Sequence, residues 1–406
     1  IRDRNMTQFW KSLSPVVEPI FHDALENQAV DETHPTWIEF DAEALRHNLS
    51  IVRKSLTPGT QIIASVKANA YGHGIIPVSQ VLEREGVEML ATGSFSDAQE
   101  IRRVGVKTPI LMLAGTLPGG MKNLIQEGFI PTVYDLIGAR SAAAAAKAIK
   151  DDYQHPIFIK VDCGMGRLGI SLPNTLRFLE EIKNMPNLWV QGLYTHLSFK
   201  DDISMKFTRE RLSLFYEMLK NVKQKGHVIP ITQALASSAL IMGLDDKCTA
   251  ICPGHVLYGL SSITEPPASM NEFLPVLTSV KSRVIHVADH RDGPSPGSGG
   301  YHRNRSLSRT GVVPFGLHDG NASIKEEKRP VVLFKGKRRR VLGVSLEHLV
   351  FEVEDGTDLE IGDETTLIGG EGPEKIELVE FADWQQSSPL EALMLLSNRL
   401  PITFKK

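Results

Sequence analysis

The stretch Ile62-Ile63-Ala64-Ser65-Val66-Lys67-Ala68-Asn69-Ala70-Tyr71-Gly72-His73-Gly74 decides the fold. It opens with a short apolar run that is typical of a buried parallel strand, and it closes with a turn that contains two glycines. The segment that follows, 73–86, has apolar residues at three- and four-residue spacing, as in an amphipathic helix. We interpret the stretch as the first β–α unit of a repeating fold, with Lys67 at the carboxyl end of its strand.

The same alternation of strand and helix continues to about residue 260. The strands are expected at 62–67, 89–92, 109–114, 131–134, 157–162, 190–195, 231–236 and from about 250. The helices are expected at 73–86, 96–104, 136–150, 173–184 and 207–225. Eight β–α repeats of this kind predict a closed, parallel (β/α)8 barrel rather than an open sheet.

After about residue 273 the pattern changes to short strands separated by glycine-rich turns. These strands are expected at 278–287, 331–334, 341–344, 349–353 and 364–368. We therefore predict an N-terminal extension at 1–35, a barrel domain at 36–272 and a mostly β C-terminal domain at 273–406. Residues 36–41 form a strand that could join the C-terminal sheet, and Asp41 would cap the helix at 42–56. Residues 290–310 are expected to form an irregular loop.

Composition narrows the classes of function. The 406-residue chain has a net charge of only -3, which argues against a nucleic-acid partner. The basic run at 335–340 is interpreted as a solvated hairpin tip between two strands. Three cysteines suit neither a disulfide framework nor a metal site. No apolar run approaches the roughly 18 residues of a membrane span. We expect a cytoplasmic protein without metal or membrane partner, and the question of a removed signal peptide stays open.

A lysine at the mouth of a barrel can condense with an aldehyde if it is partly desolvated, although a strand-end lysine can also simply reach solvent. The stretch around Lys67 is similar to the pyridoxal-phosphate (PLP) lysine motif of the alanine racemase family. Further segments resemble that family in the same order over roughly residues 36–405. They are KVDCGMGRLG at 160–169, YTH at 194–196, ASSA at 236–239, PGHVLYG at 253–259, IGDETTLIG at 361–369 and SNRLP at 397–401.

The resemblance implies a cofactor site. Lys67 would carry PLP and act as the base on one face of the substrate Cα atom. Tyr71 would give its hydroxyl to the cofactor phosphate, and Ser237 with the backbone N–H groups of Gly254 and His255 would cradle that phosphate. Taken singly, Ser237 is more readily a helix cap and Gly254 a turn residue. The ordered set of matches is what favours the cofactor roles.

The resemblance also implies a substrate side. Arg167 would lie near the ring hydroxyl of the cofactor and the substrate carboxylate. Lys160 is similar to a lysine that is carbamylated in many relatives and orients that arginine, and its state here is open. His196 is included among the catalytic candidates, although a histidine on a buried strand is more often structural.

Two positions depart from the family pattern near the reacting atoms. An ungapped alignment places Ser298 where racemases have their second catalytic residue, a tyrosine. An aliphatic hydroxyl is a much weaker acid than a phenol, whose pKa is near 10. Tyr301 supplies a phenol only if the loop shifts. Cys252 replaces the arginine that faces the pyridine nitrogen, and it is either a change of cofactor electronics or a small buried residue.

Most of the other departures lie in the half-site that the second domain is expected to contribute. Leu317 replaces a tyrosine, Leu346 with Glu347 replaces a Met-Asp pair that contacts substrate, and Ala236, in the barrel domain, replaces an asparagine. The resemblance implies a head-to-tail homodimer in which residues near 298 and 346 reach the cofactor of the partner.

Three functional interpretations follow. The first is a PLP-dependent amino-acid racemase or epimerase, with alanine or another amino acid as its substrate. The second is a PLP-dependent lyase on the same scaffold, such as a retro-aldolase, a decarboxylase or an eliminating lyase. The third is a PLP-binding protein or regulator with little catalysis.

Overall fold

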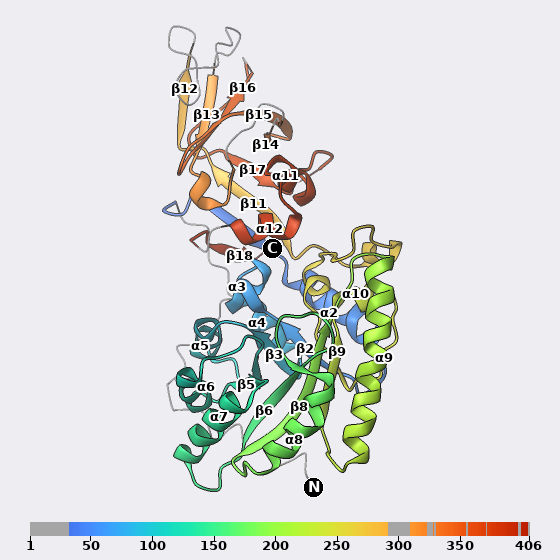
Figure 1. The fold of residues 1–406 in the computed structure, drawn as a ribbon. Coiled ribbons are helices and arrows are strands. Elements are labelled where there is room, and N and C mark those ends of the chain that lie inside the picture. Colours follow the sequence, from blue (N-terminus) through green and yellow to red (C-terminus); the bar gives the residue numbers. More distant parts are fainter. Residues whose placement is uncertain are drawn as a thin grey trace. The chain divides into compact units, whose positions relative to one another are not determined.

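The computed structural model describes residues 32–290, 309–322, 328, 330–354, 356–370, 372–396 and 399–404. These residues form two compact units, shown in Figure 1. The described part of the first unit is Leu45–Ala70 and Ile75–Leu274. The second unit contains 32–44, Tyr71–Gly74 and the described residues from Pro275 onward. Each unit is taken by itself below.

The first unit is a closed parallel barrel, as the sequence predicts. Its eight strands are β2 (Gln61–Ser65), β3 (Met89–Thr92), β4 (Ile110–Met112), β5 (Ile130–Val133), β6 (His155–Asp162), β8 (Leu188–Leu197), β9 (Ile231–Leu235) and β10 (Ala250–Ile251). Every neighbouring pair is parallel, and the pairings β5–β6 and β10–β2 close the ring. A short strand, β7 (Ile170–Ser171), adds to β6 at its carboxyl end.

Helices lie outside the ring of strands (Figure 1). They are α2 (Ala42–Ser55), α4 (Ile75–Arg84), α5 (Phe95–Arg103), α6 (Met121–Gln126), α7 (Leu136–Ile149), α8 (Thr175–Lys183), α9 (Asp202–Gln224) and α10 (Ser237–Ile241). α9 begins five residues before the expected start, because Asp201 and Ser204 form a capping box. α6 was not anticipated, because six residues are too few for a clear helical period.

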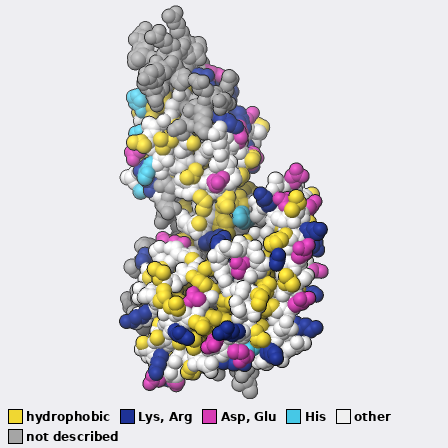
Figure 2. All heavy atoms as spheres, in the orientation of Figure 1, with side chains coloured by type: hydrophobic (Ala, Val, Ile, Leu, Met, Phe, Trp, Pro, Cys, Tyr) yellow, Lys and Arg dark blue, Asp and Glu magenta, His cyan; other side chains and the backbone are white. Residues whose placement is uncertain are grey.

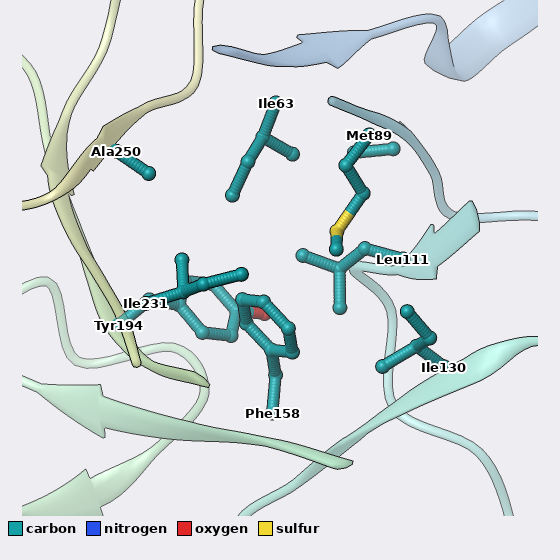
Figure 3. Packing of buried hydrophobic residues seen from close by; sticks show 9 residues of the cluster. Ile63, Met89, Leu111, Ile130, Phe158, Tyr194, Ile231 and Ala250 are labelled. Carbon is teal, nitrogen blue, oxygen red and sulfur yellow. The ribbon is translucent and has the colours of Figure 1, made fainter. Parts of the chain in front are cut away.

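Side chains fill the interior of the barrel (Figure 3). Phe158 on β6 and Tyr194 on β8 meet edge to face, with ring centroids 6.2 Å apart. Gly192 on β8 makes room for this pair, because a Cβ atom there would lie 2.3 Å from the Phe158 ring. Residues from the other strands complete the layer: Ile63, Met89, Ala91, Leu111, Ile130, Ile231 and Ala250. The barrel is therefore a packed core, and chemistry is confined to its ends.

The second unit is built on one mostly antiparallel sheet. In spatial order its strands are β12 (His286–Asp289), β13 (Arg309–Val313), β16 (Leu349–Val353), β15 (Lys337–Val344), β14 (Val331–Phe334), β17 (Glu364–Ile368), β11 (Leu277–Arg283), β1 (Thr36–Phe40) and β18 (Ile402–Phe404). β1 pairs antiparallel with β11 and parallel with β18. Two helices, α11 (Leu378–Trp384) and α12 (Pro389–Leu395), belong to the same unit.

Two expectations for this unit need correction. The run 278–287 is two strands, β11 and β12, rather than one. The basic run is not all hairpin tip, because only Lys335 and Gly336 form the turn and β15 starts at Lys337. Arg339 is buried, with 4% of its side chain exposed, and pairs with Glu354 at 2.9 Å. The sequence did not reveal the strand at 337–340, because its residues are all cationic. A long cationic side chain such as that of Arg339 can nevertheless be buried when a carboxylate pairs with it.

The surface view in Figure 2 shows basic and acidic side chains interspersed over the barrel. Among the residues described, no helix combines the length and the apolar character needed to cross a membrane.

Candidate active site

Lys67 follows β2 at the carboxyl end of the barrel, and its side chain is exposed. The next four residues, 68–71, have positive φ angles between 52° and 56° although none is glycine. Each such residue costs about 1–2 kcal/mol relative to the right-handed region. The Asn69 side chain helps to hold the segment, since its Oδ1 accepts the backbone N–H of Ile75 at 2.7 Å. Gly72 and Gly74 also have positive φ angles, 82° and 91°, which is why α4 starts at Ile75 and not at His73.

The end of β2 is tied to the turn that follows β10. The backbone N–H of Ser65 donates to the carbonyl of Pro253 at 2.9 Å, and the Tyr258 hydroxyl donates to the carbonyl of Ser65 at 2.9 Å. Tyr258 is only 1% exposed. These bonds hold the stretch that leads to Lys67 beside the 253–259 turn.

Ser237 lies at the start of α10 and is buried. Its Oγ accepts the backbone N–H of Gly254 at 2.9 Å and that of Val256 at 3.4 Å. The hydroxyl hydrogen is then left to donate to another acceptor. The Gly254 N–H, expected from the sequence to face a phosphate, donates to Ser237 Oγ in the structure.

Lys160 on β6 is the buried lysine of the cluster. Its side chain is 7% exposed, and its Nζ lies 4.9 Å from the centre of the Tyr194 ring, a cation–π distance. Burial, together with the charges of Arg167 and Lys67, lowers the pKa of Lys160 to about 8. The sequence suggested a partly desolvated lysine at position 67. In the structure Lys67 is exposed, and Lys160 is the buried lysine.

Two histidines flank the lysines. Burial lowers the pKa of His196 to about 4, and the charges of Lys67, Lys160, Arg167 and His255 act in the same direction. Burial also lowers the pKa of His255 to about 4, together with the charge of Lys67. Both imidazoles are thus neutral at pH 7, so each can donate one hydrogen bond and accept another.

Cys252 follows β10 and packs against the barrel core. Burial raises the pKa of its thiol to about 11, against the opposing effect of Lys67 and Lys160. The thiol is therefore neutral at pH 7. In the same barrel core, the Tyr194 hydroxyl and the Thr132 hydroxyl are hydrogen bonded to each other at 2.8 Å.

Arg167 lies in the exposed loop between β6 and β7. Its charge acts on Lys160 and on His196, which places it in the same electrostatic group. Sequence reasoning overlooked Asp162, whose carboxylate accepts backbone N–H groups of this loop. The signal was present as Asp-Cys-Gly-Met-Gly, because an aspartate followed by alternating glycines is typical of a loop closed on a carboxylate.

The first unit therefore brings together six of the candidates: Lys67, Lys160, Arg167, His196, Cys252 and His255. Three of these, Lys67, Lys160 and Arg167, are cationic side chains. Among the groups that act on Lys160, the one carboxylate is that of Asp162, so positive charge is in excess. Such an excess of positive charge, with the hydroxyl of Ser237 available beside the 253–256 turn, suits an anionic ligand. The residues present fit a cofactor that bears a phosphate.

The remaining candidates are not part of this group. Tyr71 is buried, at 5% exposure, and belongs to the second unit. Leu346 is exposed there at 72%, and Glu347 pairs with Arg399 at 3.4 Å. Arg399 also pairs with the buried Asp319 at 2.7 Å, a contact that the sequence did not suggest. Ser298 and Tyr301 lie outside the described residues.

Residues 40–262 match the family model for the alanine racemase N-terminal domain, and residues 277–404 match that for the alanine racemase C-terminal domain. The chain belongs to the alanine racemase family. Members of this family are PLP-dependent isomerases, and PLP bears a phosphate, which is the kind of group that the residues present fit. The family acts on small amino acids.

Individual relatives support the assignment over nearly the whole chain. An alanine racemase of Halothermothrix orenii is 30% identical over 92% of this chain and 97% of its own length. One from Methanococcus maripaludis is 30% identical over 91% of this chain and 98% of its own. Among solved structures, an alanine racemase of Clostridium difficile 630 is 25% identical with a TM-score of 0.84, covering 92% of this chain and 97% of that one.

Proposed function

We propose that this member of the alanine racemase family inverts a small amino acid at Cα, with alanine as the first substrate to be tested. The observation that carries the proposal is the group of cationic and neutral basic side chains around Lys67 at the carboxyl end of the barrel. The names of the relatives support alanine. Neither they nor the structural neighbours support another substrate or a lyase reaction.

Residues of this chain would hold the cofactor at two points. Lys67 would bind it covalently, and the hydroxyls of Ser237 and Tyr71 would donate to its phosphate. When bound, PLP supplies an electron sink that lowers the barrier to removing the Cα proton. The Lys67 amine would accept and return that proton on one face of Cα. Arg167 would bind the substrate carboxylate, and Lys160 would orient Arg167, either as the amine or in carbamylated form.

The opposite face of Cα lacks the usual acid–base residue in the proposed racemase. Ser298 aligns with the usual tyrosine, and a serine hydroxyl is a poor proton donor and acceptor at neutral pH. Since a general acid–base group typically contributes about 10²–10⁴-fold, we expect inversion to be slower than in an ordinary family member by that order. Tyr301 is the other phenol that could serve this face.

The second unit would complete the site of a partner. We propose a head-to-tail homodimer in which Leu346, Glu347 and the loop around Ser298 reach the cofactor of the other subunit. Among the described residues, Arg399 holds Glu347 in place, because it pairs with both Glu347 and the buried Asp319.

One experiment tests the function. The protein loaded with PLP is incubated in deuterium oxide with L- and D-forms of a panel of amino acids, and Cα deuteration, inversion and bond cleavage are followed together. We expect Cα deuteration of alanine with slow inversion, and Ser298→Tyr should raise inversion more than deuteration. Tyr301→Phe should matter only if Tyr301 serves the far face.

Other outcomes would change the assignment. Bond cleavage without inversion would favour the lyase alternative, for which the neutral thiol of Cys252 in place of an arginine is the specific argument. Cofactor binding with neither deuteration nor cleavage would favour a PLP-binding regulator. Fast inversion that Tyr301→Phe leaves unchanged would show that the far-face argument is wrong.

A further inference from the structure

The loop that carries Arg167 is gathered around one carboxylate. Asp162 Oδ1 accepts the backbone N–H groups of Gly164 and Met165, each at 2.8 Å, and Oδ2 accepts that of Gly166 at 2.9 Å. Burial alone would raise the pKa of Asp162, but these bonds outweigh it, and the pKa lies below its usual value. The carboxylate is therefore charged at pH 7 and serves as the common acceptor of the loop.

The outer side of the same loop rests on α9. Gly164 has φ +128°, a conformation that L side chains rarely adopt. A Cβ atom at this position would lie 3.1 Å from the Phe207 ring and 3.3 Å from Arg211 Nε. The Arg211 guanidinium in turn lies over the Phe207 ring, 4.9 Å from its centre. The loop is confined between the Asp162 carboxylate and these two side chains.

We infer that Asp162 is a positioning residue for Arg167, because its carboxylate fixes the backbone from which the Arg167 side chain departs. An amide could not replace it, since the –NH2 group of asparagine donates and would face the N–H of Gly166. The inference rests on the proposed function in one respect, that Arg167 contacts cofactor and substrate. It assigns to Asp162 no contact with either.

A double-mutant cycle tests the coupling between the two residues. The variants are Asp162→Asn, Arg167→Lys and the double variant, each loaded with PLP. The readouts are the dissociation constant of PLP and, where turnover occurs, kcat and KM measured separately. A misplacement of about 1 Å can reduce a catalytic rate such as kcat by about 10²-fold. We expect a loss approaching that size for Asp162→Asn alone, and at most about threefold when Arg167 is already lysine.

Two further variants separate the possible causes. Asp135→Asn is the matched control, because Asp135 also follows a barrel strand and accepts a backbone N–H, that of Gly138 at 2.7 Å, but it caps α7. It should leave PLP affinity unchanged. Gly164→Ala disturbs the loop and keeps the carboxylate, so it should reproduce the Asp162→Asn effect. It also serves if Asp162→Asn does not fold.

Hydrogen exchange makes the test independent of turnover. The amides of residues 164–166 should exchange faster in Asp162→Asn, whereas that of Gly138 should change little in Asp135→Asn, because asparagine caps a helix about as well as aspartate. Additive effects in the cycle, unchanged exchange at 164–166, or an Arg167→Lys variant with normal PLP affinity would each overturn the inference. If no amino acid is inverted or deuterated, the proposed function fails, while PLP affinity and exchange still decide the role of Asp162.

Discussion

Lys67 and Lys160 are two amines of one cluster with opposite surroundings. Lys67 is exposed at the mouth of the barrel, whereas Lys160 is almost fully buried against the Tyr194 ring. A pKa of about 8 leaves about a tenth of Lys160 unprotonated at pH 7. By nucleophilicity alone Lys160 would compete for an aldehyde, but its burial denies the cofactor access.

We therefore expect borohydride to fix PLP on Lys67 and not on Lys160. Peptide mapping by mass spectrometry after reduction should find the label in the peptide that contains Lys67. The label should disappear in Lys67→Ala and persist in Lys160→Met, which keeps the length of the side chain and removes the amine. Label on the Lys160 peptide of the native protein would contradict the assignment of the cofactor lysine.

At the scale of elements, the left-handed segment 68–71 has a strained backbone conformation that the surrounding chain holds in place. Ala68 is exposed and has φ 54°, so its conformation is held by the chain around it and not by packing of its methyl group. Strain of this kind persists only where the surroundings determine the backbone, and it clusters at functional sites.

Ala68→Gly should be neutral or slightly stabilising. Glycine relieves about 1–2 kcal/mol of left-handed strain and gives up about 0.5–1 kcal/mol of chain entropy. Ala68→Val should destabilise, because a β-branched residue is an outlier at positive φ. The matched control is Ala144→Gly at an exposed position inside α7, which should cost about 1 kcal/mol. Denaturant unfolding measures all three, and equal losses at both glycine substitutions would contradict the left-handed assignment.

The start of β6 makes barrel stability depend on pH. His155 is fully buried, with Nε2 2.9 Å from the carbonyl of Phe129 and Nδ1 3.0 Å from the Tyr153 hydroxyl. Burial lowers its pKa to about 4, although the bond to Phe129 acts the other way. Because the folded pKa lies below the unfolded one, the folded state keeps a neutral ring while the unfolded chain takes up a proton.

Stability from His155 should therefore be present above pH 6.5 and be lost as the pH falls toward 4. A shift from 6.5 to about 4 corresponds to about 3 kcal/mol in the free energy of unfolding. Unfolding measured from pH 7 to pH 4 should show a shallower loss in His155→Gln than in the native protein. Parallel pH profiles for the two proteins would show that His155 is not the group responsible.

At the scale of the whole molecule, neither unit contains all the candidate residues. The barrel unit holds Lys67 and its cluster, whereas Leu346 and Glu347 belong to the second unit. If the site is shared between subunits, two inactive variants can complement each other, because a hybrid dimer contains one intact pair of half-sites.

Mixing Lys67→Ala with Glu347→Lys should restore activity after the subunits exchange. Random reassociation of equal amounts gives about a quarter of the intact sites, so about that share of native activity is expected. Lys67→Ala mixed with Arg167→Ala is the control, since both changes lie in the same unit and cannot complement in this way. A native protein that keeps full specific activity as a monomer at high dilution would refute the shared site.

Much of this protein could be predicted from sequence because the relevant signals are local. Apolar spacing in each β–α unit is enough to predict the barrel, and the stretch at 62–74 places Lys67 after its first strand. The change to short strands after 273 likewise indicates the second, mostly β unit. The order of motifs along the chain was enough to name the family and PLP.

Only the tertiary structure decided which groups these elements bring together and how strongly each is desolvated. That Lys160 and not Lys67 is the buried amine, and that the Gly254 N–H donates to Ser237, depends on strands far apart in the chain. The convergence of three N–H groups on Asp162 depends on positive φ at the loop glycines. Burial, pKa and hydrogen-bond partners arise from packing between distant segments, which a local pattern of apolar residues does not contain.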